Sequence, residues 1–147
     1  MIRCSWVNNN PLYIKYHDEE WGIASYDDRY LFEMLVLESF QAGLSWECIL
    51  NKRENFRKAF DNFDYKIISE YDDTKIKKLL KDKGIIRNRL KINAAINNAK
   101  VFINIQKEFG SFSDYIWRFT NYKQIVHNKL IISNSLSDKI SLDLKKR

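Results

Sequence analysis

The chain has 147 residues, of which 45% are apolar and 14% aromatic, and it carries a formal net charge of +6. A chain of this length forms one domain that buries about two-thirds of its unfolded surface, and no stretch approaches the roughly 18 apolar residues of a membrane span. The N-terminus has no apolar run typical of a signal peptide, and Cys4 and Cys48 alone make no disulfide framework, so we expect a cytoplasmic protein without membrane contact.

The first 25 residues have an unusual density of aromatic and metal-ligating side chains. This group comprises Cys4, Trp6, Tyr13, Tyr16, His17 and Trp21. Pro11 favours a helix start, and in a helix Tyr13, Tyr16 and His17 would share one face. Such a cluster either builds the edge of a core or lines a pocket, and the pattern leaves both open. Cys4 and His17 are also candidate zinc ligands, although a structural zinc site needs four.

The segment LFEMLVLESFQAGLSW, residues 31–46, predicts a helix with a carboxylate on an apolar stripe. At helical period Leu31, Met34, Leu35 and Glu38 share this inward stripe, and Ala42 continues it. An ionised carboxylate in an apolar site is unfavourable unless a cation or hydrogen-bond donors meet it. Glu38 therefore either pairs with an arginine of another helix or faces a bound guest.

A tight corner follows this helix. Gly43 breaks it, and Ser45 is expected to cap the next helix, which begins at Trp46. The corner brings the Glu38 carboxylate close to an aromatic face. This combination suits a flat, cationic, hydrogen-bonding guest. Cys48, one turn into the second helix, is interpreted as a core residue.

The other patterns predict further helices joined by short connections. The expected caps and helix ends are, in order, Ser25 with Asp28 as a capping box, Asp64, Asp72 or Asp73, Gly84 as a C′ glycine, Asn88, Gly110 and Ser113. Residues 121–147 are weakly patterned, and no strand pair is evident. The fold class is predicted to be all-α, in a single domain over residues 1–147.

Positive charge is concentrated between residues 74 and 100. This window holds nine lysine and arginine residues against one acid, Asp82, a net charge of +8. Such clustering favours a polyanionic partner, although a solvated lysine-rich face would have the same composition. Within the window, KDKGIIRNR (residues 81–89) is a candidate helix–hairpin–helix, whose glycine turn exposes N–H groups that hold a phosphate. A plain connection between helices is the alternative.

Other catalytic chemistries find little support. A lysine Schiff base beside such a hairpin needs an aspartate a few turns later, and none follows until Asp114. The two histidines, His17 and His127, lie in no recognisable nucleophile motif. There is also no phosphate-cradling P-loop.

Four segments together resemble the bacterial DNA-3-methyladenine glycosylase I family. They are RCSWV (residues 3–7), NPLYIKYHDEEWG (10–22), LFEMLVLESFQAGLSWECILNKRENFRKAF (31–60) and GIIRNRLKINAAINNAK (84–100). The resemblance covers nearly the whole chain and is almost free of gaps. It implies a helix–hairpin–helix DNA glycosylase-like helical domain. It also implies an enzyme of base-excision repair that flips 3-methyladenine out of alkylated duplex DNA and hydrolyses its N-glycosidic bond.

The resemblance also implies roles for individual residues. Glu38 would recognise the methylated adenine, Tyr16 would hydrogen-bond to it and Trp46 would stack on it. Trp6, Tyr13 and Trp21 would line the aromatic pocket. The hairpin residues Lys83, Gly84, Arg87 and Arg89 would grip DNA phosphates. Cys4 and His17 would be the first two ligands of the family's structural zinc.

The chain departs from the family pattern at its end. In the family a later His and Cys complete the zinc site, in a segment that follows a stretch like the final Lys145, Lys146 and Arg147. Half of the ligand set is therefore absent, and we expect a C-terminally truncated glycosylase domain that acts as a monomer on double-stranded DNA containing alkylated adenine. The alternative is a non-catalytic or inactive truncated DNA-binding helix–hairpin–helix module.

Overall fold

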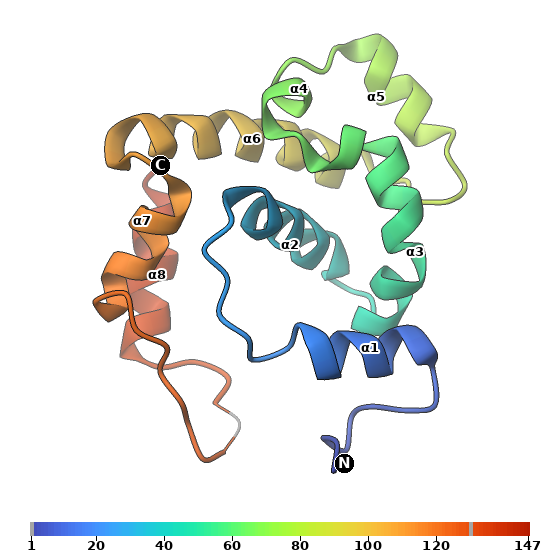
Figure 1. The fold of residues 1–147 in the computed structure, drawn as a ribbon. Coiled ribbons are helices and arrows are strands. Elements are labelled where there is room, and N and C mark those ends of the chain that lie inside the picture. Colours follow the sequence, from blue (N-terminus) through green and yellow to red (C-terminus); the bar gives the residue numbers. More distant parts are fainter. Residues whose placement is uncertain (1, 130) are drawn as a thin grey trace.

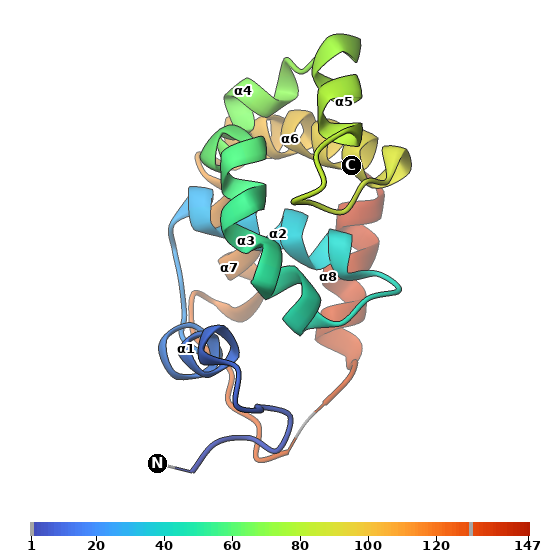
Figure 2. The same ribbon diagram turned by 90° about the vertical axis from the view of Figure 1, so that its right-hand side faces the viewer.

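A computed structural model describes residues 2–129 and 131–147 (Figures 1 and 2), and this part of the chain contains helices and no strands. The α-helices are α1 (Pro11–Glu19), α2 (Asp28–Gln41), α3 (Trp46–Ala59), α4 (Tyr65–Ser69), α5 (Asp73–Leu80), α6 (Arg89–Phe109), α7 (Phe112–Trp117) and α8 (Ser135–Lys145), with 3-10 turns η1 (Asp61–Phe63) and η2 (Arg118–Thr120). The all-α prediction is confirmed. None of the described helices is both long and apolar enough for a membrane crossing.

Helix α2 lies at the centre of the molecule (Figure 1) and contacts α3, α6 and α7. Aromatic rings dominate the core between these helices. Phe32 of α2 packs edge-on against Phe102 of α6 at 5.2 Å between ring centroids, and Phe40 packs against Phe56 of α3 at 4.9 Å. Both α3 and α6 pack on α2. Helix α1 contacts α3, and the hairpin leads directly into α6, so this packing also positions α1 and the hairpin relative to α2.

The buried face of α2 differs from the predicted stripe. The side chains facing the core are Phe32, Glu33, Val36, Leu37 and Phe40, whereas Leu35 and Glu38 are exposed. The segment is apolar over most of its circumference, so its periodicity is compatible with more than one inward face. Tertiary packing chose the face with two phenylalanines, because large aromatic side chains bury the most apolar area. Glu38 consequently lies outside the core.

Most predicted helix ends are confirmed, and two N-caps are shifted. Ser45, Asp64 and Asn88 each accept hydrogen bonds from the first turn of their helices, and Asp72 rather than Asp73 caps α5. Gly110 ends α6 with φ of 91°, a left-handed conformation that favours glycine. The two shifted caps are Asp27 in place of the Ser25–Asp28 box and Ser111 in place of Ser113.

Both corrections have one physical cause. The Asp28 carboxylate accepts hydrogen bonds from the backbone N–H groups of Phe112 and Ser113, at 2.9 and 2.8 Å. An acid of α2 thus neutralises the positive N-terminus of α7. This contact joins residues 84 positions apart in the chain, so local capping rules do not reveal it.

Gly84 is not the C′ glycine of α5. That helix ends at Leu80, and Gly84 lies four residues later in the hairpin, without a positive φ. A Cβ placed on Gly84 would come within 3.0 Å of the Asn55 side chain on α3. The position therefore requires glycine because the hairpin passes closely over α3.

Helix α8 was not predicted from the sequence. Its clearest local signal is the capping box in which Asn134 and Ser137 bond each other's backbone. None of its residues is fully buried, although Leu144 packs against the core. Its end is attached to the body by Tyr115 Oη, which donates to Asp143 at 2.6 Å, and by Arg147, which pairs with Glu108 at 2.6 Å.

Candidate active site

An aromatic pocket forms where the N-terminal segment and α1 meet the corner between α2 and α3. Its volume is about 220 Å³. The residues that line it are Trp6, Tyr13, Tyr16, Trp21, Glu38, Gln41 and Trp46. The structure thus brings together all six residues that the resemblance assigned to catalysis and base binding. Gln41 is additional, and its position one helical turn after Glu38 could have indicated it.

The aromatic side chains form a connected wall. The Trp6 ring lies 5.3 Å from Tyr13 and 5.4 Å from Trp21, while Tyr16 meets Trp46 edge-on at 5.4 Å. Such tilted and edge-on pairs are favourable and hold rings in place. The pocket therefore has aromatic surface from both α1 and α3. Of the two interpretations of the N-terminal aromatic cluster, the edge of a core or the lining of a pocket, the structure shows the second.

The N-terminal segment is held against α3 by a polar contact. The side-chain amide of Asn8 donates to both carboxylate oxygens of Glu47 at 3.0 Å, and that of Asn10 donates to Glu47 at 2.9 Å. Asn10 also caps α1. Because Glu47 directly follows Trp46, these bonds set the distance between the Trp6 side of the pocket and the Trp46 side.

Glu38 has no hydrogen-bond or ion-pair partner among the described residues, although it lines the pocket. Although Glu38 is exposed as a whole residue, the protein around the pocket partly desolvates its carboxyl group, and this raises its pKa above the usual value for glutamate. Pairing with arginine, the alternative considered for Glu38, occurs instead at Glu33, five positions earlier in α2. Glu33 accepts from Arg53 at 2.9 Å and from Arg57 at 2.8 Å. The two glutamates of α2 thus differ sharply: Glu33 is paired with arginines, whereas Glu38 is available to a guest.

Two neighbours of Glu38 carry polar atoms with unusual environments. Burial, together with the negative charges of Glu38 and Glu20, raises the pKa of Tyr16 to about 12. Tyr16 is therefore neutral at physiological pH and keeps its hydroxyl proton. The indole Nε1 of Trp46 is buried and has no acceptor in the described part of the chain, an arrangement that is rare for a buried donor.

Arg53 and Lys91 hold in place the helices that form the pocket. The sequence analysis assigned no such role to either residue. Arg53 donates to Glu20 at the end of α1 at 2.7 Å as well as to Glu33 of α2, and so ties three helices together. Lys91 of α6 donates from Nζ to the carbonyls of Phe40 and Ala42, at 3.0 and 2.7 Å. Because a cation at a helix C-terminus stabilises the last carbonyls, Lys91 fixes the corner between Glu38 and Trp46.

The candidate hairpin lies between α5 and α6, as predicted. Lys83, Arg87 and Arg89 are all exposed on it, and Ile85 is buried at 3% exposure and anchors the turn. Asn88 caps the α6 N-terminus through Lys91 N–H at 3.1 Å. Three cations therefore surround a turn that leads into the N-terminus of a long helix, which is a suitable arrangement for phosphate.

The family is decided by comparison with known proteins. Residues 6–147 match the family model described as methyladenine glycosylase. The chain belongs to the methyladenine glycosylase family. This finding confirms the resemblance drawn from the sequence.

Curated relatives of this methyladenine glycosylase align over the whole chain. DNA-3-methyladenine glycosylase 1 of Escherichia coli (strain K12) is 43% identical over 152 residues, which cover 100% of this chain and 81% of the relative. The DNA-3-methyladenine glycosylase of Haemophilus influenzae is 41% identical over 150 residues, 99% of this chain and 81% of the relative.

Solved structures of 3-methyladenine DNA glycosylase I share the fold. One matches with a TM-score of 0.92 at 43% identity and covers 99% of this chain and 82% of that chain. Another, from Staphylococcus aureus and concerned with 3-methyladenine recognition, matches with a TM-score of 0.91 at 34% identity over 98% of this chain and 79% of that chain. The predicted DNA glycosylase fold is therefore confirmed.

In this methyladenine glycosylase the two candidate zinc ligands are neighbours. The Cys4 backbone N–H donates to His17 Nε2 at 3.4 Å, and His17 Nδ1 lies 2.9 Å from Asp18 Oδ1. A carboxylate on the second ring nitrogen is typical of a metal-ligating histidine. However, residues 2–129 and 131–147 contain no group of three or more His, Cys, Asp and Glu residues that could hold a metal ion. These residues fit half of a tetrahedral site only, and the zinc cofactor stays a prediction.

Proposed function

We propose that this chain removes 3-methyladenine from alkylated duplex DNA by hydrolysing its N-glycosidic bond. The observation that carries the proposal is Glu38, a carboxylate that faces an aromatic pocket and has no partner in the part of the chain that the structure describes. A flipped 3-methyladenine is flat and, while attached to its sugar, positively charged, so it complements both features. Membership of the methyladenine glycosylase family supports the same substrate.

In the proposed reaction the target base leaves the DNA stack and enters the pocket, because its edge cannot be read within the duplex. Water adds to C1′ of the sugar, and the bond between C1′ and N9 breaks. The electron pair of that bond neutralises the positive charge of the leaving base, and the proton of water passes to solvent. A cationic base needs little protonation to leave, so the protein chiefly has to capture it and admit water.

Capture depends on charge. Glu38 accepts hydrogen bonds from the adenine edge and offsets its positive charge, while Tyr16 and Trp46 present π faces. A cation over such a face gains about 0.5–2 kcal/mol when desolvated, and neutral adenine gains far less. The difference in binding free energy between the methylated and the ordinary base gives the selectivity.

The hairpin supplies the contact with duplex DNA in this proposal. Lys83, Arg87 and Arg89, with the close-packed turn at Gly84, would hold phosphates without reading base sequence. We further propose that the chain works as a monomer, in the cytoplasm where its DNA substrate lies. Sedimentation at micromolar concentration tests the first statement, with one chain per particle expected.

Release of the free base tests the proposal directly. Duplex DNA treated with a methylating agent is incubated with the purified chain, and the liberated bases are separated by chromatography. We expect 3-methyladenine in the soluble fraction, with little release of 7-methylguanine or adenine. DNA binding without release of 3-methyladenine would instead support the non-catalytic DNA-binding module.

The pH dependence of excision should report on Glu38. The ionised carboxylate attracts the cationic base, and desolvation raises the pKa of Glu38 in the free protein. Acidification therefore protonates Glu38 at a higher pH than an ordinary glutamate, and the excision rate at limiting enzyme should fall there. The rate should rise with pH through this pKa and level off above it. Initial rates are measured after subtraction of spontaneous depurination. If Glu38→Gln keeps the same acid limb, another group is responsible.

Zinc enters this proposal in a limited form. Cys4 and His17 supply two ligands where a structural zinc site uses four. We therefore expect the purified 147-residue chain to retain well below one zinc ion per chain after gel filtration in metal-free buffer, as measured by atomic emission. Stoichiometric zinc that is lost in a His17→Ala variant would contradict this expectation and would require two further ligands.

A further inference from the structure

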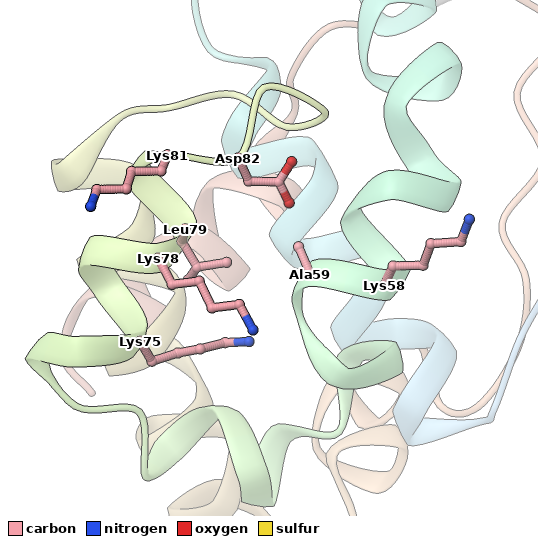
Figure 3. Close-up of a pocket in the computed structure, with 7 residues that line it drawn as sticks. All are labelled: Lys58, Ala59, Lys75, Lys78, Leu79, Lys81 and Asp82. Carbon is pink, nitrogen blue, oxygen red and sulfur yellow. The ribbon is translucent and has the colours of Figure 1, made fainter.

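A second cavity, separate from the aromatic pocket, lies between the end of α3 and α5. Its volume is about 350 Å³, and it shares no residue with the aromatic pocket. The residues that line it are Lys58, Ala59, Lys75, Lys78, Leu79, Lys81 and Asp82 (Figure 3). Four of these seven side chains are lysines, and one is acidic. The cavity is thus a concentrated positive site with a small apolar floor.

The charges of this cavity are largely uncompensated. The Asp82 carboxylate already accepts a hydrogen bond from the Gly84 N–H at 2.8 Å. The Lys75 Nζ lies 3.9 Å from Asp61 Oδ2 and 5.0 Å from the ring centre of Tyr71, so its charge is partly compensated.

The side-chain ammonium groups of the remaining lysines, Lys58, Lys78 and Lys81, have no hydrogen bond or ion pair within residues 2–129 and 131–147. Figure 3 shows the side chains of Lys75 and Lys78 reaching from α5 toward Ala59, into the space between the helices. Lys58 and Lys81 extend away from that space at its edges. Long lysine side chains can turn toward an anion in the gap.

Helix dipoles explain only part of this arrangement. Lys58 lies in the last turn of α3 and Lys78 in the last turn of α5, where cations are favourable. That effect acts on each helix separately and does not require the two sets of lysines to line one cavity. Gathering like charges is unfavourable, and an anion in the cavity would remove the repulsion.

The position of the cavity indicates which anion it takes. Lys81 and Asp82 belong to its lining and also begin the hairpin segment 81–89, directly before Lys83. The cavity lining therefore continues along the chain into the hairpin, and Figure 2 shows the backbone passing from the end of α5 through this turn into α6. A DNA strand held at the hairpin carries a phosphate about every 3.4 Å along the helix axis, so further phosphates lie beyond those at the hairpin.

We propose that this cavity is a second phosphate-binding site, which takes a phosphodiester of the DNA strand beyond the hairpin. This inference rests on the proposed function, because it requires DNA at the hairpin. The site adds sequence-independent affinity through contacts that a short duplex does not reach. The lysines of α3 and α5 are thereby part of the DNA interface, although they lie outside the hairpin.

The test compares duplexes of increasing length with a charge-removing double variant, Lys58→Gln with Lys78→Gln. Undamaged duplexes of about 8 to about 30 base pairs span roughly 27 to 100 Å at 3.4 Å per base pair. Affinity is measured by fluorescence anisotropy at several salt concentrations. Above a threshold length we expect the double variant to bind about tenfold more weakly, with the slope of log K against log salt reduced by about 1, as for the loss of one phosphate contact. Below that length the two proteins should bind equally.

Two matched variants separate this inference from the proposed function. Lys107→Gln with Lys139→Gln removes the same total charge from exposed positions on α6 and α8 and should leave affinity and slope unchanged at every length. Lys83→Gln with Arg87→Gln should weaken binding at every length, because the hairpin contacts all duplexes. If the hairpin variant behaves so and the Lys58 and Lys78 variant equals wild type throughout, the second site is refuted while the proposed function stands.

The same phosphate chemistry could serve a free anion. Calorimetry with inorganic pyrophosphate in the absence of DNA distinguishes the two sources. Weak binding or none, together with the length-dependent loss on DNA, supports the DNA strand as the ligand. Tight pyrophosphate binding that is lost in the Lys58 and Lys78 variant, without any effect on DNA affinity, would overturn the assignment to DNA.

Discussion

Replacement of Glu38 by glutamine is expected to lower the efficiency of 3-methyladenine excision at limiting enzyme by about 100-fold. This is the upper end of what a hydrogen bond to a charged group contributes. Glutamine preserves the size of the side chain but removes the negative charge that has no other partner in the pocket. The preference for 3-methyladenine over adenine should shrink in parallel. The measurement is the single-turnover rate of base release as a function of enzyme concentration.

Glu70→Gln is the matched control, because Glu70 is an exposed glutamate at the end of α4 and does not line the aromatic pocket. It should excise at the wild-type rate. A Glu38→Gln protein that keeps wild-type efficiency and selectivity would show that the carboxylate does not recognise the base. Folding of each variant is checked by its thermal transition, which we expect to be unchanged or raised for Glu38→Gln, since a desolvated charge is removed.

The second large effect is expected on stability. Arg53→Ala should lower the free energy of unfolding by about 3–5 kcal/mol, because it leaves a buried carboxylate without its partner. Arg53 is only 8% exposed, and its guanidinium binds both Glu20 and Glu33. Urea unfolding followed by circular dichroism measures the change.

Lys107→Ala, an exposed cation on α6, is the comparison for Arg53→Ala and should change stability by less than about 0.5 kcal/mol. Arg57→Ala should fall between the two, because Arg57 is more exposed and Glu33 retains Arg53. A loss below about 1 kcal/mol for Arg53→Ala would mean that the three-helix contact contributes little to stability.

The Arg53 network also explains why the site could be recognised only in part from the sequence. Two glutamates of α2, Glu33 and Glu38, lie five positions apart in a segment that is apolar on most sides. Periodicity placed Glu38 on the inward stripe, whereas the structure buries Glu33 and leaves Glu38 at the pocket. Which carboxylate meets an arginine depends on the position of α3, and that is a property of the assembled core.

The same distinction applies to lysines in the basic window. The charge count of residues 74–100 includes Lys91 and Lys78 equally and predicts that both are available to a polyanion. In the structure the Lys91 ammonium is engaged with the carbonyls at the end of α2, whereas Lys78 reaches into an uncompensated cavity. Contacts across 49 and 51 positions separate these roles.

The sequence by itself determined the helical class, most helix ends, the family and the six predicted residues of the aromatic pocket. Caps and turns could be read because they depend on hydrogen bonds between residues two to four positions apart, and the pocket residues because the family's motifs are long. Only the tertiary structure decided which face of α2 is buried, that Asp28 serves α7, and that Glu38 rather than Glu33 is left without a partner. These outcomes depend on which distant helices come into contact, and no local pattern encodes that choice.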